Sequence, residues 1–215
     1  MKAFVSWSGG KESSLSCHKT MQAKDFEIAY LLNMAGEDGE RSRSHGVSSK
    51  ILKRQSESIG IPLIQRKTTW NTYEAEFKEA IREFKKEGVA AGIFGDIDIE
   101  EHRKWVDRIC GEMGIVPVLP LWGMERETLL GEFISFGFRA AVVALNTEFL
   151  DESWLGRQID KRFVEDLRKE RGIDLCGERG EYHTLVYDGP GFREPVDFRV
   201  RGTEARNKHR LLILG

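Results

Sequence analysis

Residues 8–13 read Ser-Gly-Gly-Lys-Glu-Ser, between a short apolar segment and a segment that can form a helix. Two adjacent glycines let the backbone turn tightly and bring bare N–H groups against an anion. Lys11 adds a positive charge, and the N-terminus of a helix adds a partial positive charge. We therefore predict a phosphate-binding loop. The backbone N–H groups and hydroxyls expected to hold phosphate belong to Ser8, Gly9, Gly10 and Ser13.

The predicted loop differs from a Walker A motif. That motif requires a glycine five positions before the second glycine of this loop, and Ser or Thr directly after the lysine. Val5 and Glu12 stand at those two positions. The alternative to a phosphate-binding loop is an ordinary turn from strand to helix whose glycines allow close packing.

A second polar cluster, Gly-Asp-Ile at residues 95–97, follows an apolar run at residues 89–94. A carboxylate at the end of a strand can bind Mg²⁺ or accept a hydrogen bond from a substrate, so Asp96 and Glu12 are candidate metal ligands. An Asx turn that caps the next helix is the alternative for Asp96. Arg103, on that helix, either points at a phosphate group or is a solvated surface residue.

The third cluster is Cys-Gly-Glu-Arg-Gly-Glu-Tyr-His-Thr at residues 176–184. Acidic and imidazole side chains separated by glycines are typical of a binding loop rather than of a stable core element. Glu178 and Glu181 can hold a cationic group, and His183 can move protons or bind phosphate. His45 lies in a polar loop at residues 35–46, where it is either solvated or a lid residue that reaches the phosphates.

These clusters lie between alternating strand and helix patterns. The sequence predicts strands at residues 2–7, 27–34, 62–65, 89–94, 115–119 and 139–145. Helices are predicted at residues 13–23, 47–58, 72–87, 99–113 and 126–136. Such alternation predicts an α/β fold with a Rossmann-like, doubly wound parallel sheet. Ligands of this architecture bind at the carboxyl ends of the strands, where both the glycine loop and the acidic turn are expected.

The pattern changes after residue 146, so we predict two units. Residues 1–146 form the nucleotide-binding domain, and residues 147–215 form a smaller α+β portion that binds the substrate. In this second unit we expect helices at residues 150–155 and 161–171. Strands are expected at residues 182–187, 198–200 and 209–214.

Composition excludes several classes of function. The formal net charge of the 215 residues is −2, from 33 basic and 35 acidic residues, so no overall field favours nucleic acid or an anionic membrane. No apolar run approaches the roughly 20 residues of a membrane span, and the start of the chain does not resemble a signal peptide. The three cysteines contain no Cys-x-x-Cys pair, which argues for free thiols. We expect a cytoplasmic protein without nucleic-acid or membrane partners.

Residues 8–13 resemble the Ser-Gly-Gly-x-Asp-Ser signature of the PP-loop, or N-type, ATP pyrophosphatases, although Glu12 stands where that family usually has Asp. Together with residues 95–97, 155–157 and 176–184, they resemble the diphthine–ammonia ligase (diphthamide synthase) family. The resemblance implies an enzyme that uses ATP with Mg²⁺ to adenylate the diphthine carboxylate on translation elongation factor 2. Ammonia then displaces AMP to give diphthamide, and pyrophosphate is also released.

The resemblance also implies roles for individual residues. Lys11 would offset the charge that develops on pyrophosphate, and Leu32 and Asn33 would offer backbone groups to adenine. Carboxylates such as Glu178 and Glu181, or the face of Tyr182, would meet the trimethylammonium group of diphthine, and the two carboxylates are also candidates for orienting ammonia. The catalytic candidates are Lys11, Asp96, Glu178, Glu181 and His183. The nucleotide-binding candidates are Ser8, Gly9, Gly10, Lys11, Glu12, Ser13, Leu32, Asn33, His45, Gly95 and Arg103.

Three other functions fit parts of the sequence. A PP-loop enzyme that modifies tRNA would predict paired cysteines or a basic RNA-binding domain, and the sequence has neither. A PP-loop enzyme that amidates a small acid fits the loop equally well. A sensor that binds ATP or AMP without cleaving it is the non-enzymatic alternative, because Glu12 departs from the family signature. Free ammonium is the expected nitrogen source, and the oligomeric state, including a homo-oligomer, stays open.

Overall fold

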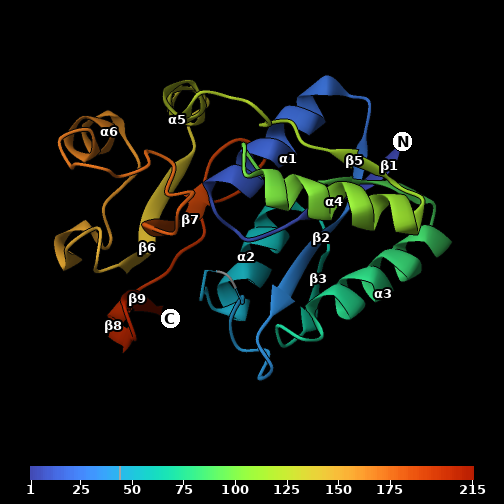
Figure 1. The fold of residues 1–215 in the computed structure, drawn as a ribbon, viewed down its shortest axis with the longest axis horizontal. Helices are drawn as coiled ribbons and strands as arrows, with labels where there is room; N and C mark the ends of the chain where they lie inside the picture. The colour runs from blue at the N-terminus through green and yellow to red at the C-terminus, as the bar shows by residue number, and fades with distance from the viewer. Residues whose placement is uncertain (44) are drawn as a thin grey trace.

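The computed structural model describes residues 1–43 and 45–215, so Ser44 of the predicted polar loop lies outside the described residues. A parallel five-stranded sheet has the order β3-β2-β1-β4-β5 (Figure 1). Its strands are β1 (Lys2–Ser6), β2 (Glu27–Ala35), β3 (Leu63–Lys67), β4 (Val89–Ile93) and β5 (Val116–Val118). The connecting helices are α1 (Lys11–Ala23), α2 (Ser49–Ile59), α3 (Tyr73–Lys86) and α4 (Glu100–Met113). This topology confirms the predicted Rossmann-like α/β fold.

Helix α3 forms where the apolar spacing predicted it, whereas the helices predicted at residues 150–155 and 161–171 are shorter, at Glu152–Trp154 and Lys161–Leu167. In α3 the buried residues Phe77, Ala80, Ile81 and Phe84 recur at intervals of three and four, so one face of the helix packs on the sheet. Strand order reverses between β1 and β4, because the chain runs from β1 outward to β3 and then returns to β4. Ligands of doubly wound sheets bind at such a switch point, which here lies beside the glycine loop.

A second, antiparallel sheet has the order β7-β6-β9-β8 and lies on the opposite side of α1 and α2 from α3 (Figure 1). Its strands are β6 (Arg139–Asn146), β7 (Tyr182–Asp188), β8 (Val200–Arg206) and β9 (His209–Leu214). Helices α5 (Arg126–Ser135) and α6 (Lys161–Leu167) and the short 3₁₀ helix η1 (Glu152–Trp154) accompany this sheet. None of the described helices is long and apolar enough to cross a membrane.

The structure corrects the assignment of the strand predicted at residues 139–145. We placed it in the parallel sheet, but β6 pairs antiparallel with β7 and β9. Residues 140–145 are all buried, and a run buried on both faces looks the same in the interior of either kind of sheet. The division of the chain after residue 146 stays a prediction, and the second sheet begins before it.

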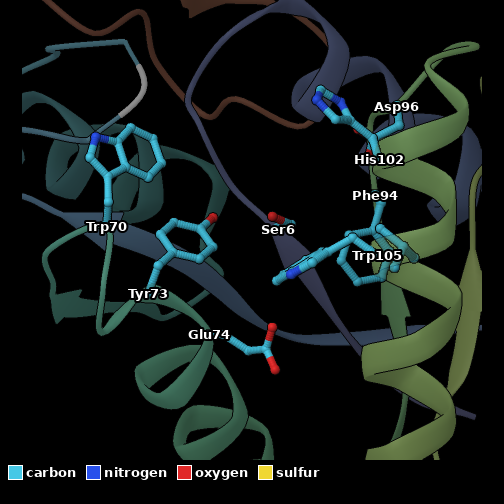
Figure 2. A pocket seen from close by; sticks show the side chains of 9 residues that line it. Ser6, Trp70, Tyr73, Glu74, Phe94, Asp96, His102 and Trp105 are labelled. Atoms are coloured by element: carbon cyan, nitrogen blue, oxygen red, sulfur yellow. The ribbon is translucent and has the colours of Figure 1, made fainter.

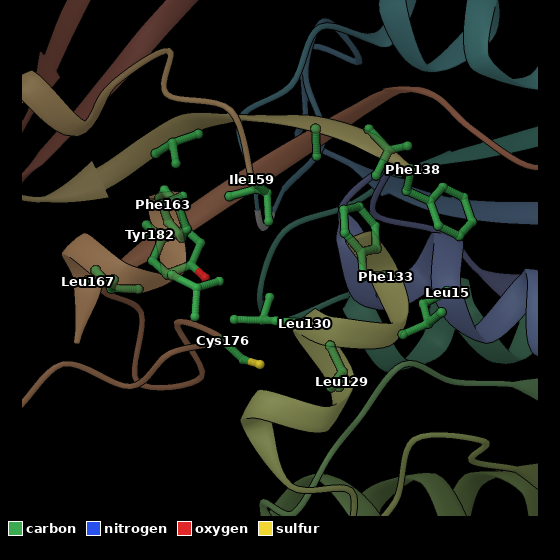
Figure 3. Packing of buried hydrophobic residues seen from close by; sticks show 14 of the residues in the cluster. Leu15, Leu129, Leu130, Phe133, Phe138, Ile159, Phe163, Leu167, Cys176 and Tyr182 are labelled. Atoms are coloured by element: carbon green, nitrogen blue, oxygen red, sulfur yellow. The ribbon is translucent and has the colours of Figure 1, made fainter. Parts of the chain in front are cut away.

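The two sheets share their cores. One apolar cluster combines Val5 and Leu52 of the first sheet layer with Val143 and Leu185 of the second sheet. Another packs Leu15 of α1 against residues of α5, and it continues to Tyr182 and α6 (Figure 3). The glycine loop between β1 and α1 therefore lies between two packed layers rather than on an open surface.

Candidate functional site

The first half of the glycine loop is fixed by contacts with α2 and β7. Gly9 adopts a φ of +79°, and a Cβ there would lie 2.5 Å from Leu52 Cδ2 and 2.7 Å from Gln55 Oε1, so only glycine fits without strain. The Gly9 carbonyl accepts hydrogen bonds from Gln55 Nε2 at 3.0 Å and from Val186 N at 2.9 Å. The fully buried Gln55 thus ties the loop to the second sheet.

The second half of the loop opens helix α1. Gly10 N donates to Ser8 Oγ at 3.2 Å, and the Ser13 hydroxyl donates to the Gly10 carbonyl at 3.1 Å. Lys11 N donates to Thr184 Oγ1 at 3.1 Å. The Thr184 hydroxyl therefore stands at the N-terminus of α1, where a helix favours an anion. Sequence reasoning missed this role, because the only signal was the inclusion of Thr184 in the cluster at residues 176–184.

The Lys11 side chain is buried beneath the C-terminal motif, with only 2% of its surface exposed. Its Nζ donates to the Cys176 carbonyl at 2.5 Å, lies 2.6 Å from Glu12 Oε1, and lies 4.6 Å from the centre of the Tyr182 ring. Burial is the largest single cause and disfavours the ammonium ion, but Glu12, Tyr182 and Cys176 together outweigh it, so the pKa of Lys11 is raised. The ring of Tyr182 is thus occupied by Lys11 and is not open to the trimethylammonium group we expected there.

A cavity of about 340 Å³ opens beside this ion pair, and we call it the phosphate cavity. It is lined from both halves of the chain. Of the predicted site residues it brings together Ser8, Lys11, Glu12, Ser13, His45, Gly95, Asp96, Glu178 and His183. Gly95 allows this closeness, because a Cβ there would lie 3.0 Å from Glu12. The structure therefore joins three sequence clusters, widely separated along the chain, in one site.

Three predicted nucleotide contacts lie elsewhere. The Leu32 carbonyl accepts from Trp7 N at 2.7 Å, and the Asn33 side chain donates to the Trp7 carbonyl at 2.8 Å and accepts from Gln65 at 3.1 Å. The Leu32 carbonyl and the Asn33 side chain are thus used within the sheet, and neither residue lines the phosphate cavity. The Arg103 guanidinium lies 4.8 Å from the Trp122 ring centre, and Arg103 is not among the residues that line the phosphate cavity. The nucleotide-binding roles expected for these three residues stay predictions.

The two glutamates of the C-terminal motif have different surroundings. Glu181 is fully buried, and its oxygens accept from Asp174 N at 2.8 Å and Arg179 N at 2.9 Å. It therefore shapes its own loop and does not line the phosphate cavity, and the catalytic role expected for it stays a prediction. Glu178 lines the phosphate cavity, and no hydrogen bond or ion pair joins its carboxylate to the part of the chain that the structure describes. Burial, with the nearby Glu12 carboxylate, raises the pKa of Glu178 to about 7.

Two histidines close another wall of the phosphate cavity. The rings of His45 and His183 are stacked, with centres 4.5 Å apart and planes 27° apart. His45 Nδ1 lies 3.4 Å from the Thr184 carbonyl. Burial lowers the pKa of His45 and lowers that of His183 well below its usual value, so both rings are neutral at pH 7. His183 thus lies beside the cavity, with its ring stacked on that of His45.

Asp96 faces a partner that sequence reasoning missed. Its Oδ1 lies 3.1 Å from Nδ1 of His102 on the first turn of α4, and this hydrogen bond raises the pKa of His102. The only sequence signal was a histidine near the start of the helix after the acidic turn. Both residues, with Ser6, also line a second cavity of about 600 Å³. The two cavities are therefore neighbours that share one wall.

Aromatic side chains surround this second cavity, which we call the aromatic cavity (Figure 2). Trp70 and Tyr73 lie on one side of it, and Phe94 and Trp105 lie on the other, with Glu74 below. Tyr73 and Trp105 lie on helices α3 and α4, and both border this cavity. Flat apolar walls of this kind suit a purine ring, because every base offers a face for stacking.

Similarity searches find two family models and several named relatives. The diphthamide synthase N-terminal domain matches residues 1–117, and the diphthamide synthase C-terminal domain matches residues 125–211. The diphthine–ammonia ligase of Homo sapiens is 27% identical over 215 residues, covering 88% of this chain and 79% of that protein. That of Danio rerio is 24% identical, covering 88% of this chain and 83% of that protein.

One solved structure is similar over most of its length. It is described as a predicted subunit of a tRNA methyltransferase from Methanocaldococcus jannaschii, with 16% sequence identity and a TM-score of 0.46. The alignment covers 88% of this chain and 98% of that chain. Of the two family ranges, the first contains the glycine loop and the second contains residues 176–184.

Proposed function

Because the chain belongs to the diphthamide synthase family, we propose that it is an ATP-dependent amide-forming ligase. Its acceptor is the diphthine carboxylate on translation elongation factor 2, and its second substrate is ammonia, as the name of the relatives implies. ATP is cleaved between its α- and β-phosphates, the carboxylate is adenylated, and ammonia displaces AMP. The products are diphthamide, AMP and pyrophosphate.

The observation that carries this proposal is the composition of the phosphate cavity. The reaction requires a phosphate-binding loop, an acceptor carboxylate and ammonia in one place. Loop residues such as Ser8 and Ser13 line the same 340 Å³ cavity as Glu178 and His183 of the C-terminal motif. A sensor would need only the phosphate-binding loop, whereas a ligase needs both that loop and the residues of the C-terminal motif.

In this proposal the phosphates of ATP lie at the N-terminus of α1, and the adenine lies in the aromatic cavity. The shared lining residues Ser6, Asp96 and His102 then face the ribose and the α-phosphate. Lys11 acts electrostatically on the pyrophosphate that leaves, as the family resemblance implies. Binding and orientation by the protein supply most of the acceleration, and no protein nucleophile is required.

The residues present fit a magnesium ion. In the described part of the chain, Glu12 Oε1 is buried without a hydrogen-bond partner and has only the Lys11 ammonium beside it. Among the described residues, no three His, Cys, Asp or Glu side chains gather as a metal site. Mg²⁺ in nucleotide sites is held by one or two carboxylates plus substrate phosphates, and Glu12 and Asp96 would supply those carboxylates. When bound, the ion would neutralise charge on the phosphates.

We further propose a cytoplasmic enzyme that uses free ammonium and has neither a nucleic-acid nor a membrane partner. The near-zero formal charge of −2 supports this, because it provides no general attraction to polyanions. A homo-oligomer is compatible with the proposed reaction, which uses residues of one chain only.

Incubating the protein with ATP, Mg²⁺, ammonium and diphthine-bearing elongation factor 2 tests the proposal. We expect AMP and pyrophosphate to appear in equal amounts, and only when both the acceptor and ammonium are present. Mass spectrometry of the factor should show an amide in place of the carboxylate. If ATP is instead cleaved only when a small acid or tRNA is added, that molecule is the acceptor and not the elongation factor. ATP that binds but is never cleaved would favour a sensor.

The proposed base site makes a separate prediction. Replacing Trp105 with alanine should weaken AMP binding by about tenfold or more, because stacking on an aromatic ring contributes about 1–3 kcal/mol per base. Pyrophosphate binding should not change, since it uses the glycine loop alone. Isothermal titration calorimetry with each ligand measures the two affinities. Trp122→Ala is the matched control, because Trp122 packs on Arg103 outside both cavities. Equal losses for AMP and pyrophosphate would contradict the assignment.

A further inference from the structure

The phosphate cavity has three carboxylates in its lining, and they differ in what they contact. Glu12 is paired with Lys11 at 2.6 Å, and Asp96 is hydrogen-bonded to His102 at 3.1 Å. Glu178 is the third, and within residues 1–43 and 45–215 its oxygens have neither a hydrogen bond nor an ion pair. A carboxylate that lines a cavity without a partner of its own is available to a bound cation.

The loop around Glu178 is built to hold it there. Gly177 has a φ of +73°, and a Cβ at this position would lie 2.8 Å from the Tyr182 carbonyl, so the turn before Glu178 is packed against β7. Glu181 closes the turn on the other side by accepting from Arg179 N at 2.9 Å. Both contacts restrict the backbone that carries Glu178 and fix it at the cavity.

The other groups able to accept a proton in the cavity are less suited. His183 is stacked on His45, and its lowered pKa makes it a weak base. His102 already bonds Asp96, and the side chain of Lys11 is held as an ammonium ion. At neutral pH ammonia is largely protonated to ammonium. Only unprotonated ammonia has the lone pair needed for attack on a carbonyl carbon.

We propose that Glu178 is the catalytic base that takes a proton from ammonium bound in the phosphate cavity. This rests on the proposed ligase function and deepens it, because it names the group that generates ammonia. One N–H bond of ammonium breaks and its proton passes to a Glu178 oxygen. The freed lone pair forms the C–N bond with the acyl carbon of the adenylate, and the bond from that carbon to the phosphate oxygen breaks with its electron pair on AMP. The attacking nitrogen then loses one further proton to solvent to give the neutral amide.

The electrostatic surroundings suit this role. Burial, followed by the charge of Glu12, raises the pKa of Glu178 to about 7, and a base with a pKa near the working pH is the most effective. Charged and titratable groups face it from α1, α4, α5, its own loop and β7. They are Lys11, Glu12, His102, Arg126, Asp174, Cys176 and His183. Lys11 and Arg126 oppose the shift, so Glu178 keeps an ionised fraction at neutral pH.

The test measures the turnover of the Glu178→Gln variant with each of two nucleophiles, ammonium and hydroxylamine. Hydroxylamine is mostly unprotonated at neutral pH and needs no base to attack, whereas ammonium does. We expect the variant to lose about 100-fold or more of its kcat with ammonium at pH 7, the usual contribution of general base catalysis. With hydroxylamine it should keep a kcat close to that of the wild type. Exchange of labelled pyrophosphate into ATP, which reports adenylation alone, should be unchanged.

The pH dependence gives an independent readout. Ionised Glu178 is the active base, so ammonium-supported turnover by the wild type should rise with pH until this carboxyl group is fully ionised. The Glu178→Gln variant depends on ammonia formed in solution, so its deficit should shrink by about tenfold per pH unit above that point. Glu181→Gln is the matched control, because a disturbed loop should lower turnover with both nucleophiles alike.

Several outcomes would overturn the role of Glu178 while leaving the ligase function intact. Equal losses with ammonium and hydroxylamine would make Glu178 a structural residue. A raised KM for the acceptor with an unchanged kcat would assign it to the trimethylammonium group of diphthine. If the wild-type protein releases no AMP with diphthine-bearing factor and either nucleophile, the ligase function itself fails.

Discussion

Replacing Lys11 with methionine is expected to reduce acceptor-dependent pyrophosphate release by about 100-fold or more. Preorganised charges that act on developing charge typically contribute this much. Methionine is an unbranched side chain one atom shorter than lysine, and it removes the charge. The Glu12 carboxylate then loses its partner at 2.6 Å, and the Cys176 carbonyl loses its donor at 2.5 Å. Single-turnover assays of pyrophosphate release measure the loss.

The same substitution should also destabilise the fold, and the two effects must be separated. Removing one member of a buried ion pair costs about 3–5 kcal/mol, because the other charge is left without a partner. The pKa of Lys11 is raised in the folded state, so its ion pair stabilises the protein fully below the unfolded lysine pKa of about 10.4 and is lost only at higher pH. Urea unfolding should therefore show a constant deficit between about pH 6 and pH 9.

Lys19 supplies the matched control. It lies on the same helix and pairs with Glu132 at 2.5 Å, but about a quarter of its surface is exposed. A partly exposed ion pair contributes about 0–1 kcal/mol, so Lys19→Met should change neither stability nor pyrophosphate release strongly. If Lys11→Met folds normally and still releases pyrophosphate at the wild-type rate, the proposed electrostatic role of Lys11 is wrong.

Gly9→Ala should have the second large effect. The φ of +79° disfavours any residue with a Cβ, and that Cβ would also meet Leu52 at 2.5 Å and Gln55 at 2.7 Å. Strained backbone of this kind costs about 1–3 kcal/mol, and the clash adds to it. The loop must shift to relieve both, so pyrophosphate affinity should fall by about tenfold or more. Calorimetry and thermal unfolding measure the two losses.

Substitutions at two other glycines separate the cost of backbone strain from the cost of the clash with Leu52 and Gln55. Gly137 has a φ of +84°, but no atom of the described residues lies within 4 Å of the position that a Cβ would take, so Gly137→Ala reports the backbone cost alone. Gly111 lies inside α4 with equally open space and no positive φ, so alanine there should stabilise the protein by about 0.5–1 kcal/mol. Pyrophosphate affinity that stays at the wild-type value in Gly9→Ala would show that the loop does not bind phosphate.

The fold could be predicted from the sequence because its elements have strong periodic patterns. Helix α3 was expected at residues 72–87 and extends from Tyr73 to Lys86. The sheet to which β6 belongs could not be predicted, because a fully buried strand carries no signal of its neighbours. Tyr73 and Trp105 show the same limit for helices, since an apolar helix face looks alike whether it meets a core or a cavity.

The site could be predicted only where chemistry and spacing together restrict it. Glu178 and Glu181 are the same residue type three positions apart, yet one lines the cavity and the other binds backbone N–H groups. Turns with positive φ at Gly177 and Gly180 set this difference, and such turns have no periodic signature. Leu32 and Asn33 were assigned by analogy, and the hydrogen bonds of a central strand already use the Leu32 carbonyl and the Asn33 side chain.

The bonds that complete the glycine loop have a consequence for how the protein is made. Lys11 meets the Cys176 carbonyl and the Thr184 hydroxyl across 165 and 173 positions of the chain. During synthesis the parallel sheet leaves the ribosome before β7 does and can fold early. A nascent chain therefore carries the glycine loop long before it carries the groups that hold it. The glycine loop gains both of these partners only after β7 has been synthesised, so a nascent chain that stops before Tyr182 has an incomplete loop.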